Sequence, residues 1–156
     1  MSLVPFRMRR AGPSFLPSLP WISTFTETNV RTYVRDSQGR PGVWFDSLDI
    51  TRLLPVAVAR AGYRLPYMWA QMTIREKEGR IEYRARRRWP GPRGASSRLL
   101  VTPGAAIAET EQSPLERFLT ARWGLYTMLG RRLAYAPVDH PTWPLQTAEI
   151  HLIDDE

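Results

Sequence analysis

Four polar side chains recur at every second position near the start of the chain. Glu27, Asn29, Arg31 and Tyr33 supply a carboxylate, an amide, a guanidinium and a phenol. The run 26–34 around them is rich in β-branched and aromatic residues, which predicts a strand with alternating faces. The four polar groups then share one face, which suits a small polar ligand. The alternative is that this face meets water while the Val and Thr face packs in the core.

Two members of this row have the clearest chemistry. The planar guanidinium of Arg31 can hold a carboxylate through two parallel hydrogen bonds. If a reaction follows binding, Glu27 is the candidate acid or base and Arg31 the electrostatic stabiliser, and we predict these two as the catalytic pair. The predicted ligand-binding residues are Asn29, Tyr33, Tyr67, Arg87 and Tyr126.

Arg87 belongs to an arginine-rich segment that predicts a strand over 81–89. Alternation places it on one face with Tyr83, Ala85 and Trp89, and it assigns Arg84, Arg86 and Arg88 to a solvent-facing side. A buried arginine is costly unless it is paired, so Arg87 needs a carboxylate. That carboxylate belongs either to a ligand or to Glu27, and in the second case the pair is structural.

Other candidate groups are weaker. Asp139 and His140 are adjacent in a proline-rich loop, and an Asp–His pair could serve acid–base chemistry. Adjacent side chains seldom face each other, so we favour loop anchoring. Trp123 and Tyr126 follow a predicted helix and are most simply core residues. Phosphate-cradling glycine loops and the strand–GxSxG nucleophile motif are both missing from the sequence.

The composition sets further limits. A chain of 156 residues with 43% hydrophobic and 24% charged residues is typical of one globular domain, and no apolar run is long enough to span a membrane. We therefore expect a cytoplasmic protein. The chain has no cysteine and only two histidines, which excludes thiolate chemistry and a three-histidine zinc site. No metal or other cofactor is predicted.

Short strands dominate the predicted elements. Strands are predicted over 3–9, 26–34, 43–49, 66–74, 81–89, 97–102 and 145–153, with two further short segments, 125–129 and 133–136, around a turn. Helices are predicted over 51–62, ending at Gly62, and from the capping box Ser113-Pro-Leu-Glu116 to about Arg122. A proline-punctuated loop occupies 12–20. This order predicts an α+β fold, mostly antiparallel, with barrel-like closure that would protect the sheet edges.

Motifs along nearly the whole chain resemble the DUF2071, or YqjF-like, family of uncharacterised bacterial proteins. They are Leu3-Val-Pro-Phe-Arg-Met8, Phe25-x-Glu-x-Asn-Val-Arg-Thr-Tyr-Val34, Gly42-Val-Trp-Phe-Asp-Ser-Leu-Asp49, Leu65-Pro-Tyr67, Tyr83-x-Ala-x-Arg87, Leu115-Glu-Arg-Phe-Leu119, Leu125-Tyr126 and Trp143-Pro-Leu-Gln146. The resemblance implies a relationship to acetoacetate decarboxylase, and with it a β-rich, barrel-like fold around a small cavity.

The sequence departs from that superfamily in two respects. The lysine that forms a Schiff base with a ketone follows a proline in those decarboxylases, whereas Pro66-Tyr67-Met68 carries no amine. Lys77, the only lysine, lies in a charged turn where nothing would lower its pKa. Standard acetoacetate decarboxylation is therefore not expected. Members of the resembled family also extend further at both ends, so 1–156 reads as a single domain of a shortened or fragmentary member.

Three functional hypotheses remain. The first is a cavity that binds a small carboxylate or carbonyl compound, with or without catalysis. The second is a non-catalytic ligand-sensing or interaction domain that uses the same pocket. The third is a nucleic-acid binder, suggested by the net charge of +7, although the arginines are spread along the chain and only one lysine accompanies them. A homo-oligomer is compatible with all three.

Overall fold

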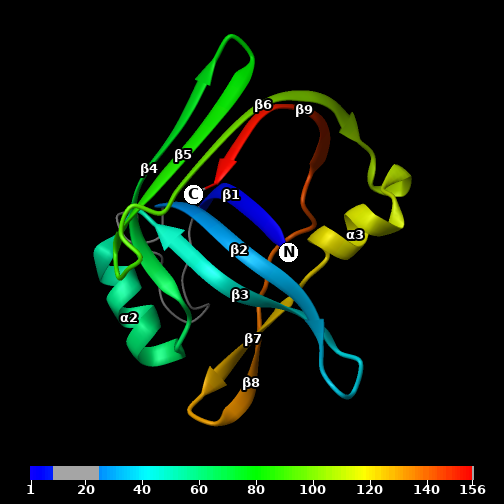
Figure 1. Ribbon diagram of the computed structural model, residues 1–156. Coiled ribbons are helices and arrows are strands. Elements are labelled where there is room, and N and C mark those ends of the chain that lie inside the picture. The colour runs from blue at the N-terminus through cyan, green and yellow to red at the C-terminus, as the bar shows by residue number, and fades with distance from the viewer. Residues whose placement is uncertain (9–24, 156) are drawn as a thin grey trace.

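The computed structural model describes residues 1–8 and 25–155, and these form one strongly curved mixed sheet flanked by short helices (Figure 1). The predicted proline-punctuated loop lies outside the described residues. The strands are β1 Ser2–Met8, β2 Phe25–Arg35, β3 Pro41–Ile50, β4 Tyr67–Lys77, β5 Arg80–Trp89, β6 Ser96–Ile107, β7 Gly124–Leu129, β8 Arg132–Pro137 and β9 Leu145–Asp155. The helices are α2 Leu53–Tyr63, the 3₁₀ turn η1 Glu109–Glu111 and α3 Pro114–Thr120.

The sheet branches at β3. Its main path runs β1-β2-β3-β4-β5-β6-β9, and the β7–β8 hairpin joins it through β7. The free edge of β3 is shared by two parallel partners: β4 pairs with its end at Leu48–Ile50, and β7 pairs with Val43 and Trp44. Because these two strands leave β3 at opposite ends, the sheet splays around the middle of β3.

A β-bulge lies beside the same region. In the antiparallel β2–β3 ladder, Val30 pairs with Ser47 while Arg31 pairs with Phe45, so Asp46 is the extra residue. A bulge increases local twist and redirects neighbouring side chains. It therefore bends the hairpin at the position of Arg31.

The expected barrel closure is not found. Among the described residues β1 and β9 stand at the two ends of the strand path and share no ladder. Most pairs are antiparallel, as the sequence predicts, and the two parallel contacts of β3 make the sheet mixed. The observed architecture is thus an open, mostly β sheet with two short α-helices in the described part of the chain.

Both helices sit close to their predicted positions. α2 begins two residues later than predicted and continues one residue past Gly62, ending at Tyr63. Arg64 follows as a left-handed C-cap with φ 55°. Arg60 Nη1 then donates to the Tyr67 carbonyl at 2.9 Å, which ties α2 to the start of β4. α3 has the predicted capping box, with both Ser113–Glu116 hydrogen bonds formed, and it ends at Thr120, before Arg122.

The apolar core is small. Leu48 and Ile50 of β3 and Val56 of α2 are the largest side chains that are almost wholly buried. Several residues buried in β2 are polar or charged. Charged side chains are rarely fully buried in proteins unless they are paired. Among the described residues, no helix combines the length and apolar character needed to cross a membrane.

Candidate functional site

A cavity of about 450 Å³ lies over the polar face of β2. Its floor is built by Glu27, Asn29 and Arg31 of β2 together with Phe45 and Leu48 of β3. Its walls come from other segments and comprise Phe6, Met8, Val43, Leu65, Tyr67, Arg122, Gly124, Leu125, Val138, Asp139, His140 and Trp143. The volume falls within the range of small-molecule sites, and most of the lining is apolar.

The sequence did not decide whether the face of β2 with Glu27, Asn29 and Arg31 meets water, and in the structure it is buried. Glu27, Asn29 and Arg31 are 3%, 2% and 7% exposed. The opposite face is also largely covered, since Thr28 is 6% exposed and Val30 is half-buried. The carboxylate, amide and guanidinium therefore lie inside the protein and line the cavity.

The loop after β8 supplies one wall and is fixed by polar contacts. The Trp123 indole donates to the His140 carbonyl at 3.0 Å, and Val138 N donates to the Trp123 carbonyl at 3.1 Å. The two ring nitrogens of His140 lie 2.9 Å from the Arg122 carbonyl and 2.8 Å from the Pro141 carbonyl. His140 thus fastens this loop to the segment after α3, in keeping with the anchoring role favoured from the sequence.

Arg31 is held by neutral partners. Its Nε donates to the Tyr33 hydroxyl at 3.2 Å and its Nη2 donates to the Leu119 carbonyl at 3.0 Å. Its guanidinium carbon also lies 5.2 Å from the centre of the Trp143 ring. Within the described residues no carboxylate forms an ion pair with Arg31. A buried cation without an anionic partner is costly.

A second guanidinium, that of Arg122, lines the same cavity. Its carbon lies 4.3 Å from the Phe118 ring centre and 5.6 Å from the Tyr33 ring centre. Burial lowers the pKa of Arg122, and the positive charges of Arg35 and Arg31 lower it further. The sequence marked Arg122 only as the end of a helix. Nothing in its local pattern signalled that it would lie beside Arg31.

Glu27 is a carboxyl group in an environment that disfavours its charge. Burial raises the pKa of Glu27 to about 7, and the hydrogen bond from Asn29 and the charge of Arg31 only partly oppose this. Asn29 Nδ2 donates to Glu27 Oε1 at 3.2 Å. A carboxyl that titrates near neutral pH is suited to accept or release a proton, as a general acid or base must.

Three buried polar atoms on residues that line this cavity have no hydrogen-bond partner among the described residues: Glu27 Oε2, Asn29 Oδ1 and Arg122 Nε. Buried polar groups in folded proteins are paired in the great majority of cases, and each unpaired one costs about 1–3 kcal/mol. All three belong to residues that line one cavity. A bound molecule with complementary groups would satisfy them together.

Tyr67 and Tyr33, both predicted to bind the ligand, occupy different positions relative to the cavity. Tyr67 lines the cavity, and its burial, with the nearby charge of Glu27, raises its pKa above the ordinary value. Tyr33 lies beyond the cavity lining, where its hydroxyl accepts a hydrogen bond from Arg31 Nε and lies 3.2 Å from both Ser2 Oγ and the Leu119 carbonyl. Tyr33 therefore positions Arg31 and does not face the cavity.

The structure places two other predicted ligand-binding residues elsewhere. Arg87 forms a bidentate pair with Asp49, with Nε–Oδ1 at 3.0 Å and Nη2–Oδ2 at 3.2 Å, on the opposite face of the β2–β3 hairpin. Its carboxylate partner is therefore Asp49 and not Glu27. Tyr126 is 4% exposed, donates to the Arg40 carbonyl at 3.0 Å and packs against Tyr135. Neither residue lines the β2 cavity.

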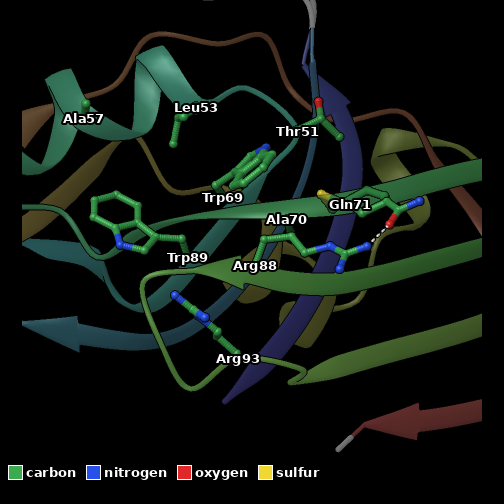
Figure 2. A pocket seen from close by; sticks show the side chains of 10 residues that line it. Thr51, Leu53, Ala57, Trp69, Ala70, Gln71, Arg88, Trp89 and Arg93 are labelled. Carbon is green, nitrogen blue, oxygen red and sulfur yellow. Dashed lines mark hydrogen bonds between the residues drawn. The ribbon is translucent and has the colours of Figure 1, made fainter.

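An open groove of about 1100 Å³ between α2, β4 and β5 is larger than this cavity (Figure 2). Leu53 and Ala57 of α2 border one side, and Trp89 borders the other. The ring of Trp89 is 44% exposed and that of Trp69 37% exposed. No buried side-chain polar atom of the described residues is left unpaired in this groove, so it lacks the feature that marks the β2 cavity.

The arginine face of β5 is exposed, as predicted, but it is partly neutralised. Arg84 and Arg98 both pair with Glu82, each at 2.7 Å, and Arg88 donates to Gln71 Oε1 (Figure 2). Paired arginines of this kind are poorly placed to follow a phosphate backbone. Trp123, expected in the core, is 45% exposed.

Neither a metal cluster nor a buried amine accompanies the cavity. No group of three His, Cys, Asp or Glu side chains that could hold a metal ion occurs in the described part of the chain. The side chain of Lys77 is 86% exposed at the end of β4 and lies 3.4 Å from Glu78. Lys77 is not among the residues that line the cavity, so it is not placed to act as a Schiff-base nucleophile there.

Comparisons with known proteins agree with the motif resemblance. The family model of DUF2071, described as an uncharacterised conserved protein, matches residues 1–156. The chain is 34% identical over 152 residues to the protein YqjF of Bacillus subtilis strain 168, which is likewise described as uncharacterised. The match covers 97% of this chain and 62% of YqjF. No solved structure matches significantly.

Proposed function

This chain belongs to the DUF2071 family, whose description names no activity, and we propose from its geometry that it binds a small carboxylate or carbonyl compound in the β2 cavity. The observation that carries the proposal is the set of unpaired, buried polar atoms around two guanidinium groups. An acidic ligand would supply the negative charge that Arg31 lacks among the described residues.

Each lining residue has a role in this proposal. Arg31 and Arg122 hold the acidic group of the ligand through charge-assisted hydrogen bonds, which are stronger than those between neutral groups. Asn29, Glu27 and Tyr67 orient the remainder of the molecule. The apolar side chains of β3, including Phe45 and Leu48, contact its hydrocarbon part.

Chemistry on the bound molecule would depend on Glu27. Its pKa of about 7 allows it to take up or donate a proton near neutral pH, with Arg31 stabilising negative charge that develops on the ligand. A decarboxylation through a Schiff base has no amine in this cavity to support it. The alternative is a sensing domain, in which the same pocket binds its ligand without turnover.

The test is thermal unfolding of the chain with and without a panel of small carboxylates, keto acids and short oligonucleotides. A ligand that binds only the folded state raises the unfolding midpoint, by an amount equivalent to about 2.7 kcal/mol at a concentration 100 times its Kd. We expect a shift with at least one acid and its loss in Arg31→Gln, because the substitution removes the cation that holds the acid.

Arg86→Gln is the matched control, since Arg86 is an exposed arginine of β5 outside the cavity. It should retain the shift. A shift produced by oligonucleotides and not by acids would support the nucleic-acid hypothesis instead. Binding that persists in Glu27→Gln while turnover of the same compound disappears would separate a catalyst from a sensor.

A further inference from the structure

Resting on the proposed function, we infer that the ligand is a hydroxy acid whose hydroxyl group lies several carbon atoms away from its carboxylate. The two ends of the β2 cavity present opposite hydrogen-bonding groups to a ligand. The end near Arg31 and Arg122 offers donors, and the end near Asn29 and Glu27 offers acceptors.

The acceptor end is set by Asn29. Its Nδ2 donates to Glu27 Oε1 at 3.2 Å, which leaves Oδ1 as the free atom of the amide. An amide oxygen has no proton to give in any state, so only a donor on the ligand can satisfy it. Asn29 is 2% exposed, which keeps bulk water from this atom.

The donor end is set by the two guanidinium groups. Arginine offers N–H groups only, so Arg122 Nε needs an acceptor. Arg31 is drawn towards Tyr33 and the Leu119 carbonyl, away from Asn29, and Arg122 lies over the Phe118 and Tyr33 rings. Both cations therefore gather at the Tyr33 end of the cavity.

The spacing separates the two groups on the ligand. Residues 29 and 31 are two positions apart on one strand, which corresponds to about 7 Å along the strand. The side chains also turn to different partners, since Asn29 is hydrogen-bonded to Glu27 and Arg31 to Tyr33 and the Leu119 carbonyl. A 2-hydroxy acid carries its hydroxyl next to the carboxylate and cannot reach both ends, whereas an acid with a distant hydroxyl can.

The donor is a hydroxyl group rather than an ammonium group because of charge. Two guanidinium groups already line the cavity. Glu27, the buried carboxyl among the described residues that line it, has a pKa of about 7 and is only partly ionised at neutral pH. Asp139 also lines the cavity but is exposed to water. A third cation would be repelled, while a neutral hydroxyl would not.

Four probes of equal carbon number test the inference by isothermal titration calorimetry: hexanoate, 6-hydroxyhexanoate, 2-hydroxyhexanoate and 1,6-hexanediol. We expect 6-hydroxyhexanoate to bind at least about tenfold more tightly than hexanoate, because it pairs a buried acceptor that hexanoate leaves unpaired. 2-Hydroxyhexanoate should show no such gain, and the diol, which lacks the acid, should bind most weakly.

Variants locate the effect. Asn29→Leu should abolish the preference for 6-hydroxyhexanoate over hexanoate, while Thr28→Val, on the opposite face of the same strand, should keep it. If Asn29→Leu fails to fold, the order of the four probes on the unaltered chain decides.

The possible results separate the inference from the proposed function. Equal affinity for hexanoate and 6-hydroxyhexanoate, or tighter binding of 2-hydroxyhexanoate, would overturn the inference and leave an acid-binding cavity in place. The absence of binding by all three acids would overturn the proposed function as well.

Discussion

Arg87 and Arg31 lie on opposite faces of the β2–β3 hairpin and differ in whether a carboxylate neutralises them. On one face Arg87 grips Asp49 through two hydrogen bonds, and the charges balance within the protein. On the other face Arg31 is bonded to a hydroxyl and a carbonyl, and its charge has no ion-pair partner among the described residues. A cation that the fold neutralises is part of the architecture, whereas the one that the described residues leave without an ion pair is where we propose that an anion binds.

The groove beside α2 and the β2 cavity also differ in whether their polar groups are satisfied by the protein. The groove beside α2 is more than twice as large as the β2 cavity, at about 1100 Å³ against 450 Å³. Its aromatic side chains are half in water, and no buried polar atom is left unpaired there in the described residues. Size alone therefore does not identify the site. Our proposal for the β2 cavity rests instead on its buried polar atoms that have no hydrogen-bond partner among the described residues.

The largest expected effect on stability is on the face of the hairpin where Arg87 pairs with Asp49. Arg87→Leu should lower the free energy of unfolding by roughly 3–5 kcal/mol, because it removes the cation that balances the buried Asp49. Urea unfolding measures this loss. The double variant with Asp49→Leu should recover much of the stability, since replacing both charges removes the imbalance. A loss below about 1 kcal/mol in the single variant would show that the pair contributes little.

The next effect is a pH dependence that belongs to the cavity face. The pKa of Glu27 is about 7 in the folded chain and about 4.5 as an unperturbed group, so the folded state holds an extra proton between these values. Stability should therefore fall as the pH rises from about 4.5 to 7 and then level off, by about 3 kcal/mol in all. Urea unfolding at pH 5 and pH 8 measures this fall.

Glu27→Gln should remove that difference, because an amide does not titrate. All other residues are the same in the two chains, so subtracting the two pH profiles isolates the contribution of Glu27. Parallel pH profiles for the two chains would mean that Glu27 is solvated and ordinary.

The smallest expected effect on stability is that of Arg31, on the cavity face. Arg31→Gln, without ligand, should change the free energy of unfolding by less than about 1 kcal/mol, because the loss of hydrogen bonds to Tyr33 and Leu119 is offset by relief of an unneutralised buried charge. Urea unfolding at pH 8 measures it beside Arg87→Leu. A loss as large as that of Arg87→Leu would show that Arg31 is also structural.

Most of the fold could be predicted from local patterns. The alternation in β2 and the turn after it fixed the first hairpin, and the serine, proline and glutamate at 113–116 fixed the start of α3. These signals are local, since each depends on neighbours within a few residues. The barrel closure was not predictable in the same way, because it depends on whether β1 and β9 meet across the whole chain.

The site was predictable only in part. The sequence placed Glu27, Asn29 and Arg31 on one face of a strand, and the structure brings them together there with Tyr67. It did not indicate Arg122 or Trp143, which reach the cavity from segments about 90 residues or more further along the chain. It also grouped Arg87 and Tyr126 with the row, although Arg87 finds Asp49 and Tyr126 packs against Tyr135.

The sequence by itself determined which side chains share a face, because alternation along a strand is a property of the backbone. It also determined that a buried arginine would need a partner, because the cost of burying a charge is general. Only the tertiary structure decided which face of β2 is enclosed and which arginine is neutralised. Both outcomes depend on long-range packing of β5, the segment after α3 and the loop after β8, and no local pattern encodes such contacts.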